Sequence, residues 1–183
     1  MNGLDFVLAL VILIGVIIGL RRALLRVLVS IVGIYFTVLV AAYVYHPMGW
    51  TLSEALNDLN PSFDPGKTAM YNFSYLIIVA CMTVIVELVS ASYLEDTHIP
   101  VLGRVDHLLG GVAGVLYGAL WASLLLMPVQ YGIARSGGSW ISAVNQSELV
   151  PILNQVFRNG VLEVVRLLLL DGIPPLYQPV FLR

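Results

Sequence analysis

Three acidic residues stand within or beside long apolar runs, where a carboxylate could do chemistry. Glu87 is the one formally charged residue between positions 69 and 92. An ionisable group inside a membrane span is costly, and it often marks an ion or proton path or pairs with another group. The simpler interpretation, which we favour, is that Glu87 lies near the cytoplasmic end of its span and extends its carboxylate to the headgroups.

Asp5 and Asp106 each stand at the start of an apolar run. The first turn of a helix stabilises a carboxylate through its free N–H groups and its dipole, by about 0.3–1 kcal/mol. This structural role accounts for both residues without a function, and we favour it. The alternative is that one of them pairs with an arginine and fixes how two helical hairpins dock.

Basic residues near the ends of the apolar runs predict an orientation. One side of the predicted membrane carries Arg21, Arg22, Arg26 and Arg104, and the other carries Lys67 and Arg135. Because cytoplasmic loops hold an excess of Lys and Arg, the turn after the first span should face the cytoplasm and both termini should face outward. The same four arginines are candidates for contact with anionic headgroups, at about 1 kcal/mol each.

Motifs of the common catalytic and nucleotide-binding sites are missing from the sequence. It has no H-E-x-x-H, no G-x-S-x-G, no P-loop and no dinucleotide fingerprint. Its three histidines are spread over predicted loops without the helical spacing of metal ligands. The net charge of −2 gives no reason to expect a nucleic-acid partner. We therefore expect no enzyme activity, no metal site and no cofactor.

The elements that position these residues are long apolar helices. The chain has 183 residues, of which 59% are hydrophobic and 11% charged, whereas charged residues make up about a quarter of an ordinary globular domain. Four segments come close to the roughly 20 residues that cross a bilayer as a helix: 4–20, 27–45, 69–92 and 108–127. The expected fold is an all-α integral membrane protein with four transmembrane helices in two hairpins, within residues 1–131.

Two further helices are predicted outside the spans. Capping-box spacing at Thr51 and Glu54 predicts a short surface helix that stops at Asn60-Pro61. Residues 132–183 are expected to form a linker, an amphipathic helix that starts near Asn145 and continues to Leu170, and an irregular tail. A polar stripe on this helix favours a position at the membrane interface. Whether the helix lies on the membrane or folds back onto the bundle stays open.

Glycines recur at four-residue spacing in two of the predicted spans. Gly110, Gly114 and Gly118 share one helical face, and Gly15 and Gly19 share another. Small residues at this spacing let helix backbones approach closely in lipid, so we assign these five to helix packing. Whether the partner helix belongs to the same chain or to a second copy is open. The alternative is that the glycines line a narrow pore.

These motifs resemble those of a known family. An N-terminal Asn-x-Leu-Asp leads into a span that ends in Gly-x-Arg-Arg, and Asp-x-Leu-Leu-Gly-x-x-x-Gly-x-x-x-Gly follows from Asp106. This arrangement resembles the colicin V production protein (CvpA) family, over roughly residues 1–127. The resemblance implies a four-span protein of the bacterial inner membrane, linked to colicin V production and envelope stress tolerance, without an established molecular activity.

From the resemblance we expect a non-enzymatic accessory or scaffold for export or the cell envelope, linked to toxin production. Its expected partners are the lipid bilayer, further copies of itself and an export or envelope protein. The alternative is a small transporter or channel, formed by one chain or by an oligomer. In that case Glu87, with Asp5 and Asp106, would belong to an ion pathway.

Overall fold

The computed structural model describes residues 2–22, 24–59, 67–94, 104–136 and 140–166, together with Leu168, Pro174, Pro175 and Tyr177. The long helices are α1 (Gly3–Arg21), α2 (Leu24–Leu59), α3 (Lys67–Leu94) and α4 (Arg104–Ser136). The shorter elements are α5 (Trp140–Asn145), α6 (Leu149–Phe157), the π-helical turn η1 (Arg158–Leu162) and α7 (Glu163–Arg166). The part of the chain described here contains no strand.

Four of these helices are long and apolar enough to cross a membrane. Their qualifying segments are Gly3–Arg21, Leu24–Asp58, Ala69–Ser92 and Val105–Gln130, with mean hydropathies between 1.9 and 2.8. The predicted fold class, an all-α membrane protein with four spans and a further C-terminal helix, is therefore confirmed.

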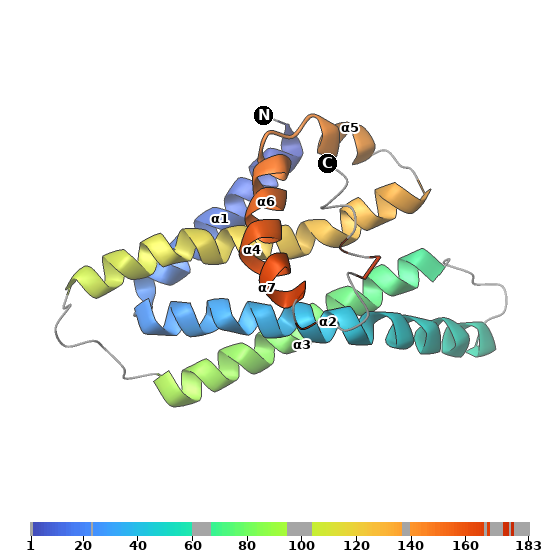
Figure 1. Ribbon diagram of the computed structural model, residues 1–183, viewed down its shortest axis with the longest axis horizontal. Coiled ribbons are helices and arrows are strands. Elements are labelled where there is room, and N and C mark those ends of the chain that lie inside the picture. Colours follow the sequence, from blue (N-terminus) through green and yellow to red (C-terminus); the bar gives the residue numbers. More distant parts are fainter. Residues whose placement is uncertain are drawn as a thin grey trace.

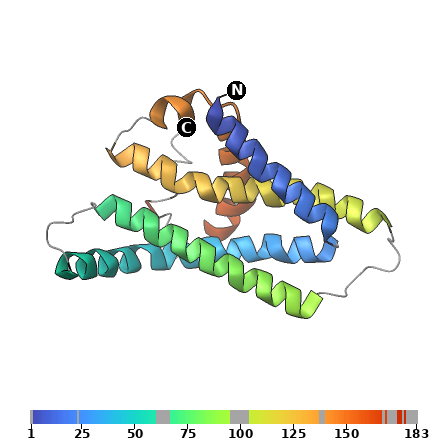
Figure 2. The same ribbon diagram turned by 180° about the vertical axis from the view of Figure 1, so that it is seen from behind.

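The long helices pack between the two hairpins more than within them. The most extensive contact of α1 is with α4, and that of α2 is with α3, while α2 also touches α4. Figures 1 and 2 show α1 crossing α4 and α3 crossing α2. A short turn joins α1 to α2, so the end of α1 comes beside helices that are distant from it in sequence. This arrangement positions the candidate site.

Two predicted helix ends are wrong, and in both cases a proline follows shortly after the predicted end. The helix predicted to end at residue 45 continues to Leu59 through Pro47, so the separate surface helix from Thr51 does not exist. The helix predicted to end before Pro128 continues to Ser136. A proline removes one backbone hydrogen bond and crowds the preceding turn, whereas starting a new helix requires a costly nucleus. A long helix already formed on both sides therefore absorbs the proline.

The C-terminal helix folds back onto the bundle, which answers the question that the sequence left open. It runs across α4 toward α2 (Figure 1), and α6 contacts α4 while α7 contacts α2. Its apolar side is buried at Val150, Leu153, Phe157, Val161, Leu162 and Val165. Residues predicted as a separate C-terminal segment thus share the core of the spans.

The predicted start of this helix is also wrong. Asn145 is the last residue of α5, and α6 begins at Leu149 with no side-chain cap from Glu148. Ser147 supplies the cap instead, because its Oγ accepts a hydrogen bond from the N–H of Val150 at 3.1 Å. The described helix ends at Arg166. Positions 137–139 of the predicted linker, 167 and 169–170 of the predicted helix, and most of the predicted tail lie outside the described residues.

Tyr177, in the predicted tail, is itself buried in the core. Its hydroxyl donates to the carbonyl of Val38 in α2 at 3.1 Å, and its ring packs beside Tyr75 and Phe157. Burial, followed by the neighbouring Tyr75, raises the pKa of the Tyr177 phenol well above its usual range. The phenol therefore stays a neutral hydrogen-bond donor to α2.

Candidate functional site

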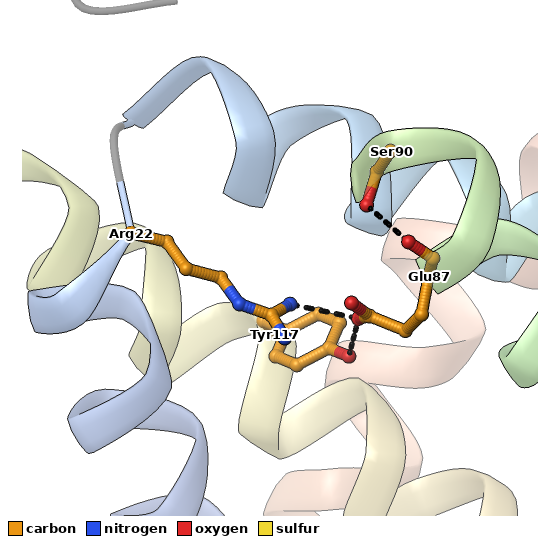
Figure 3. Close-up of polar contacts among 4 residues, drawn as sticks. All are labelled: Arg22, Glu87, Ser90 and Tyr117. Carbon is orange, nitrogen blue, oxygen red and sulfur yellow. Dashed lines mark hydrogen bonds and ion pairs between the residues drawn. The ribbon is translucent and has the colours of Figure 1, made fainter. Parts of the chain in front are cut away.

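The carboxylate of Glu87 lies at a junction of three elements. Its Oε1 atom is 2.8 Å from the guanidinium of Arg22 at the end of α1, and it accepts a hydrogen bond from the Tyr117 hydroxyl of α4 at 3.1 Å. Figure 3 shows all three side chains pointing toward one another. The Arg22 and Glu87 side chains are 24% and 26% exposed, so each is about three-quarters buried.

The local backbone explains why Arg22 can reach this position. Arg22 is the C-cap residue of α1, with an extended backbone (φ −106°, ψ 151°), and its N–H still donates to the carbonyls of Ile18 and Gly19. The chain therefore leaves the helix at this residue, and its side chain crosses to α3. In α3, the Ser90 hydroxyl donates to the Glu87 carbonyl at 3.2 Å.

The structure pairs Glu87 with Arg22, which is the alternative to the favoured headgroup contact of either residue. Their side chains meet where the end of α1 comes beside α3 (Figure 3). Pairing is one of the ways in which charged residues are accommodated in a membrane. Sequence reasoning missed Tyr117, although a tyrosine in the middle of the apolar run from Leu108 was a signal that a polar partner is needed there.

Asp5 joins the start of α1 to the start of α6. With Asn2 it forms a capping box, in which the Asp5 N–H donates to Asn2 Oδ1 at 3.0 Å and the Asn2 N–H donates to Asp5 Oδ2 at 2.9 Å. Its other oxygen accepts the Ser147 hydroxyl and the Leu149 N–H, the latter at 3.2 Å. The aspartate thus caps its own helix, as the favoured prediction has it, and also holds the C-terminal helix.

Asp106 makes a similar link at the other end of the bundle. It lies in the first turn of α4, where it is 1% exposed, and its Oδ1 accepts the N–H of Leu24 at 3.1 Å. Leu24 is the first residue of α2, and the first N–H groups of a helix have no partner within it. A carboxylate from α4 therefore satisfies one of these N–H groups of α2. Both aspartates therefore join the starts of two helices. Their partners include backbone N–H groups, whereas the alternative predicted an arginine side chain.

The five glycines form one contact between α1 and α4 of the same chain. A Cβ atom on Gly15 would lie 2.5 Å from the Gly118 Cα atom, and one on Gly19 would lie 2.8 Å from the Gly114 Cα atom. A Cβ atom on Gly110 would lie 2.5 Å from the Gly19 carbonyl oxygen. These backbones touch directly, which leaves no room for a side chain at the crossing.

Among the described basic side chains, neither Arg21 nor Arg26 makes a hydrogen bond or ion pair with this network. Arg21 is exposed at the end of α1, Arg26 is partly buried in the first turns of α2, and the side chain of Arg104 lies outside the description. The role of Arg21 in topology and headgroup contact stays a prediction. Within the described residues no three His, Cys, Asp or Glu side chains gather as metal ligands do.

An apolar groove of about 270 Å³ runs between α1 and α4 and reaches α3. Val11, Ile14 and Ile18 of α1 form one side of it. Thr83 and Tyr117 line both this groove and a much smaller cavity beside Glu87.

Together, four apolar helices and charges paired inside the bundle define a multi-pass helical membrane protein. A family model described as Colicin V production protein matches residues 4–158, and the chain therefore belongs to the colicin V production protein family. The match extends past the predicted limit near residue 127 and includes α6. No curated protein and no solved structure matches the chain.

Proposed function

We propose that this member of the colicin V production family is a non-enzymatic accessory or scaffold protein of the bacterial cytoplasmic membrane, which assists toxin export. Family membership links it to colicin V production. The proposal adds the kind of role: the protein would hold a surface in the membrane for other proteins, without transforming or transporting a substrate itself.

The observation that supports this role is the use of the acidic groups within the bundle. Glu87, Asp5 and Asp106 all contact groups of the same chain, as described above. Active sites and ion paths instead present polar groups to a substrate or ion. Outward, the spans offer apolar side chains such as Phe6, Leu88 and Val112, which are 71%, 63% and 70% exposed. Such a surface suits lipid and apolar helices of other proteins.

A transporter or channel is not favoured by this geometry. The charge of Glu87 is balanced by Arg22 at 2.8 Å, so an ion approaching it would have to displace a bound guanidinium. The glycines that could have lined a path pack in the contact between α1 and α4, where Gly15 and Gly118 also border the apolar groove.

We further propose that the turn after α1 faces the cytoplasm and that both termini lie outside. Arg21, Arg22 and Arg26 around that turn support this orientation. The C-terminal helix would then lie near the outer leaflet, because its first residues contact Asp5 at the outer end of α1.

Toxin export in cells tests the scaffold role. Cells that make colicin V and lack the gene would receive either the wild-type chain or a variant with an altered outer face. Leu88→Trp on α3 and Leu13→Trp on α1 change exposed positions without touching the core. We expect at least one of them to lower toxin release while protein amount and melting temperature stay unchanged, whereas Glu87→Gln in folded protein should have little effect on release.

Two outcomes would contradict the proposal. Normal toxin release from cells that lack the gene would remove the accessory role. Loss of release with Glu87→Gln alone, at wild-type amount and stability, would make Glu87 part of the activity. Gly114→Leu is unsuitable for this test, because it would disrupt packing inside the chain before any assembly.

A further inference from the structure

A small cavity lies between α2, α3 and α4, beside Glu87. Its volume is about 10 Å³. Unlike the outer groove, it is lined by several polar side chains: Ser30, Thr37, Thr83, Glu87 and Tyr117. In the middle of an apolar bundle, this concentration of oxygen atoms calls for an explanation.

Ser30 is the buried polar residue of this cavity that most needs an explanation. Its side chain is 2% exposed, and its Oγ atom has no hydrogen-bond partner among the described residues. Thr37 and Thr83 behave differently, since their hydroxyls donate to the carbonyls four residues earlier, at 2.9 and 2.6 Å. The oxygens of these threonines can still accept a hydrogen bond. A buried hydroxyl that lacks a partner is destabilising, and Ser30 lies beside a cavity with room for such a partner.

We propose that this cavity binds a single water molecule, which hydrogen-bonds to Ser30 and connects it to the polar group around Glu87. A volume of this size holds about one water, and two to four polar partners are what a buried water requires. Larger solutes do not fit. The site is therefore defined both by its size and by its hydrogen-bonding groups.

Charge decides between water and an ion of similar size. Arg22 already balances the charge of Glu87 at 2.8 Å, so the site is neutral as it stands. A sodium ion or another small cation would add an unpaired charge within the spans, and an anion would meet the Glu87 carboxylate as well. Either is costly at membrane depth, whereas water adds no charge.

The water would complete a network that touches all four spans. Arg22 brings in the end of α1, Glu87 brings in α3 and Tyr117 brings in α4. Ser30 would add α2, which otherwise has no described hydrogen bond to this group. The inference goes beyond the proposed function, because it concerns how the bundle is held and not what it assists.

Two serine variants test the site. Ser74 is a matched control, because it is also fully buried with an Oγ atom that has no partner among the described residues, yet it lines neither cavity. In the same lipid or detergent, Ser74→Ala should leave the melting temperature unchanged or raise it. Ser30→Ala should lower it by about 2–4 °C. Equal effects of the two variants would overturn the proposal.

Water-edited solid-state NMR on the protein in lipid vesicles gives a direct readout. We expect magnetisation transfer from water to Thr37, which lines this cavity and not the outer groove, and Ser30→Val, which adds bulk and removes the hydroxyl, should abolish it while the other resonances keep their positions. Transfer that survives Ser30→Val, or is missing in the wild type, would refute the site. If the melting temperature of the wild type differed between sodium and choline buffers, the site would bind a cation and not a water.

Discussion

The Arg22–Glu87 pair offers the sharpest quantitative prediction. The two side chains are each about three-quarters buried and 2.8 Å apart, and Glu87 also accepts the Tyr117 hydroxyl. Hydrogen bonds to charged groups contribute about 1.5–3 kcal/mol in soluble proteins. Polar contacts between membrane helices average only about 0.6 kcal/mol, with a maximum near 1.7. We therefore expect a coupling energy of about 1–2 kcal/mol between Arg22 and Glu87.

A double-mutant cycle measures this coupling. Glu87→Gln, Arg22→Gln and the double variant would be unfolded reversibly in mixed micelles, and the free energies of unfolding compared. Each single variant leaves one charge without its partner, so each should lower the melting temperature by about 2–4 °C per kcal/mol lost. The double variant should cost less than the sum of the two. Glu54→Gln, at an exposed position of α2, controls for the loss of a carboxylate in general.

A coupling energy below about 0.3 kcal/mol would refute this reasoning, since that value is no larger than the usual error of additivity. It would mean that Glu87 and Arg22 reach headgroups or water independently. Recovery of stability in the exchanged variant Arg22→Glu with Glu87→Arg would give independent support, because only a direct pair can be inverted.

Three further predictions concern the helix contacts. Gly114→Ala should lower the free energy of unfolding by about 1–3 kcal/mol, because the added methyl group crowds the crossing of α1 and α4. Gly160→Ala, which has open space around it, should not lower the free energy of unfolding, and equal losses in the two variants would contradict the packing. Asp5→Asn should loosen the C-terminal helix and speed hydrogen exchange at Leu149 before the spans change, and unaltered exchange would exclude this link. Tyr177→Phe should cost about 0.5–1.5 kcal/mol in chemical unfolding, and a neutral effect would show that its hydrogen bond to α2 contributes nothing.

The spans and their packing surfaces could be predicted because they depend on local sequence. Length and hydropathy identify each long apolar helix, and four-residue spacing places Gly110, Gly114 and Gly118 on one face whatever the partner is. The helix ends at Pro47 and Pro128 could not be predicted in the same way. Whether the helix continues there depends on the length of helix on each side of the proline. A local stop signal carries no information about that length.

The partners of the acidic residues could not be predicted, because they depend on which helices become neighbours. Glu87 is separated by 65 positions from Arg22 and by 30 from Tyr117. Nothing in the composition of either segment specifies that the end of α1 comes beside α3. The link from Asp5 to Ser147 spans 142 positions and requires that the C-terminal helix folds back. Sequence favoured the headgroups for Glu87 because the residue stands near the end of its span and Ser90 and Ser92 follow it.

The central claim is that the charges of this bundle hold its helices together and do not conduct. Ion and proton flux in liposomes that contain the purified, folded protein tests it most directly, with Glu87→Gln measured in parallel. We predict no flux above that of protein-free liposomes for either protein, with a lower melting temperature for the variant. Flux through the wild type that disappears in Glu87→Gln would contradict the account and make Glu87 part of a conduction path.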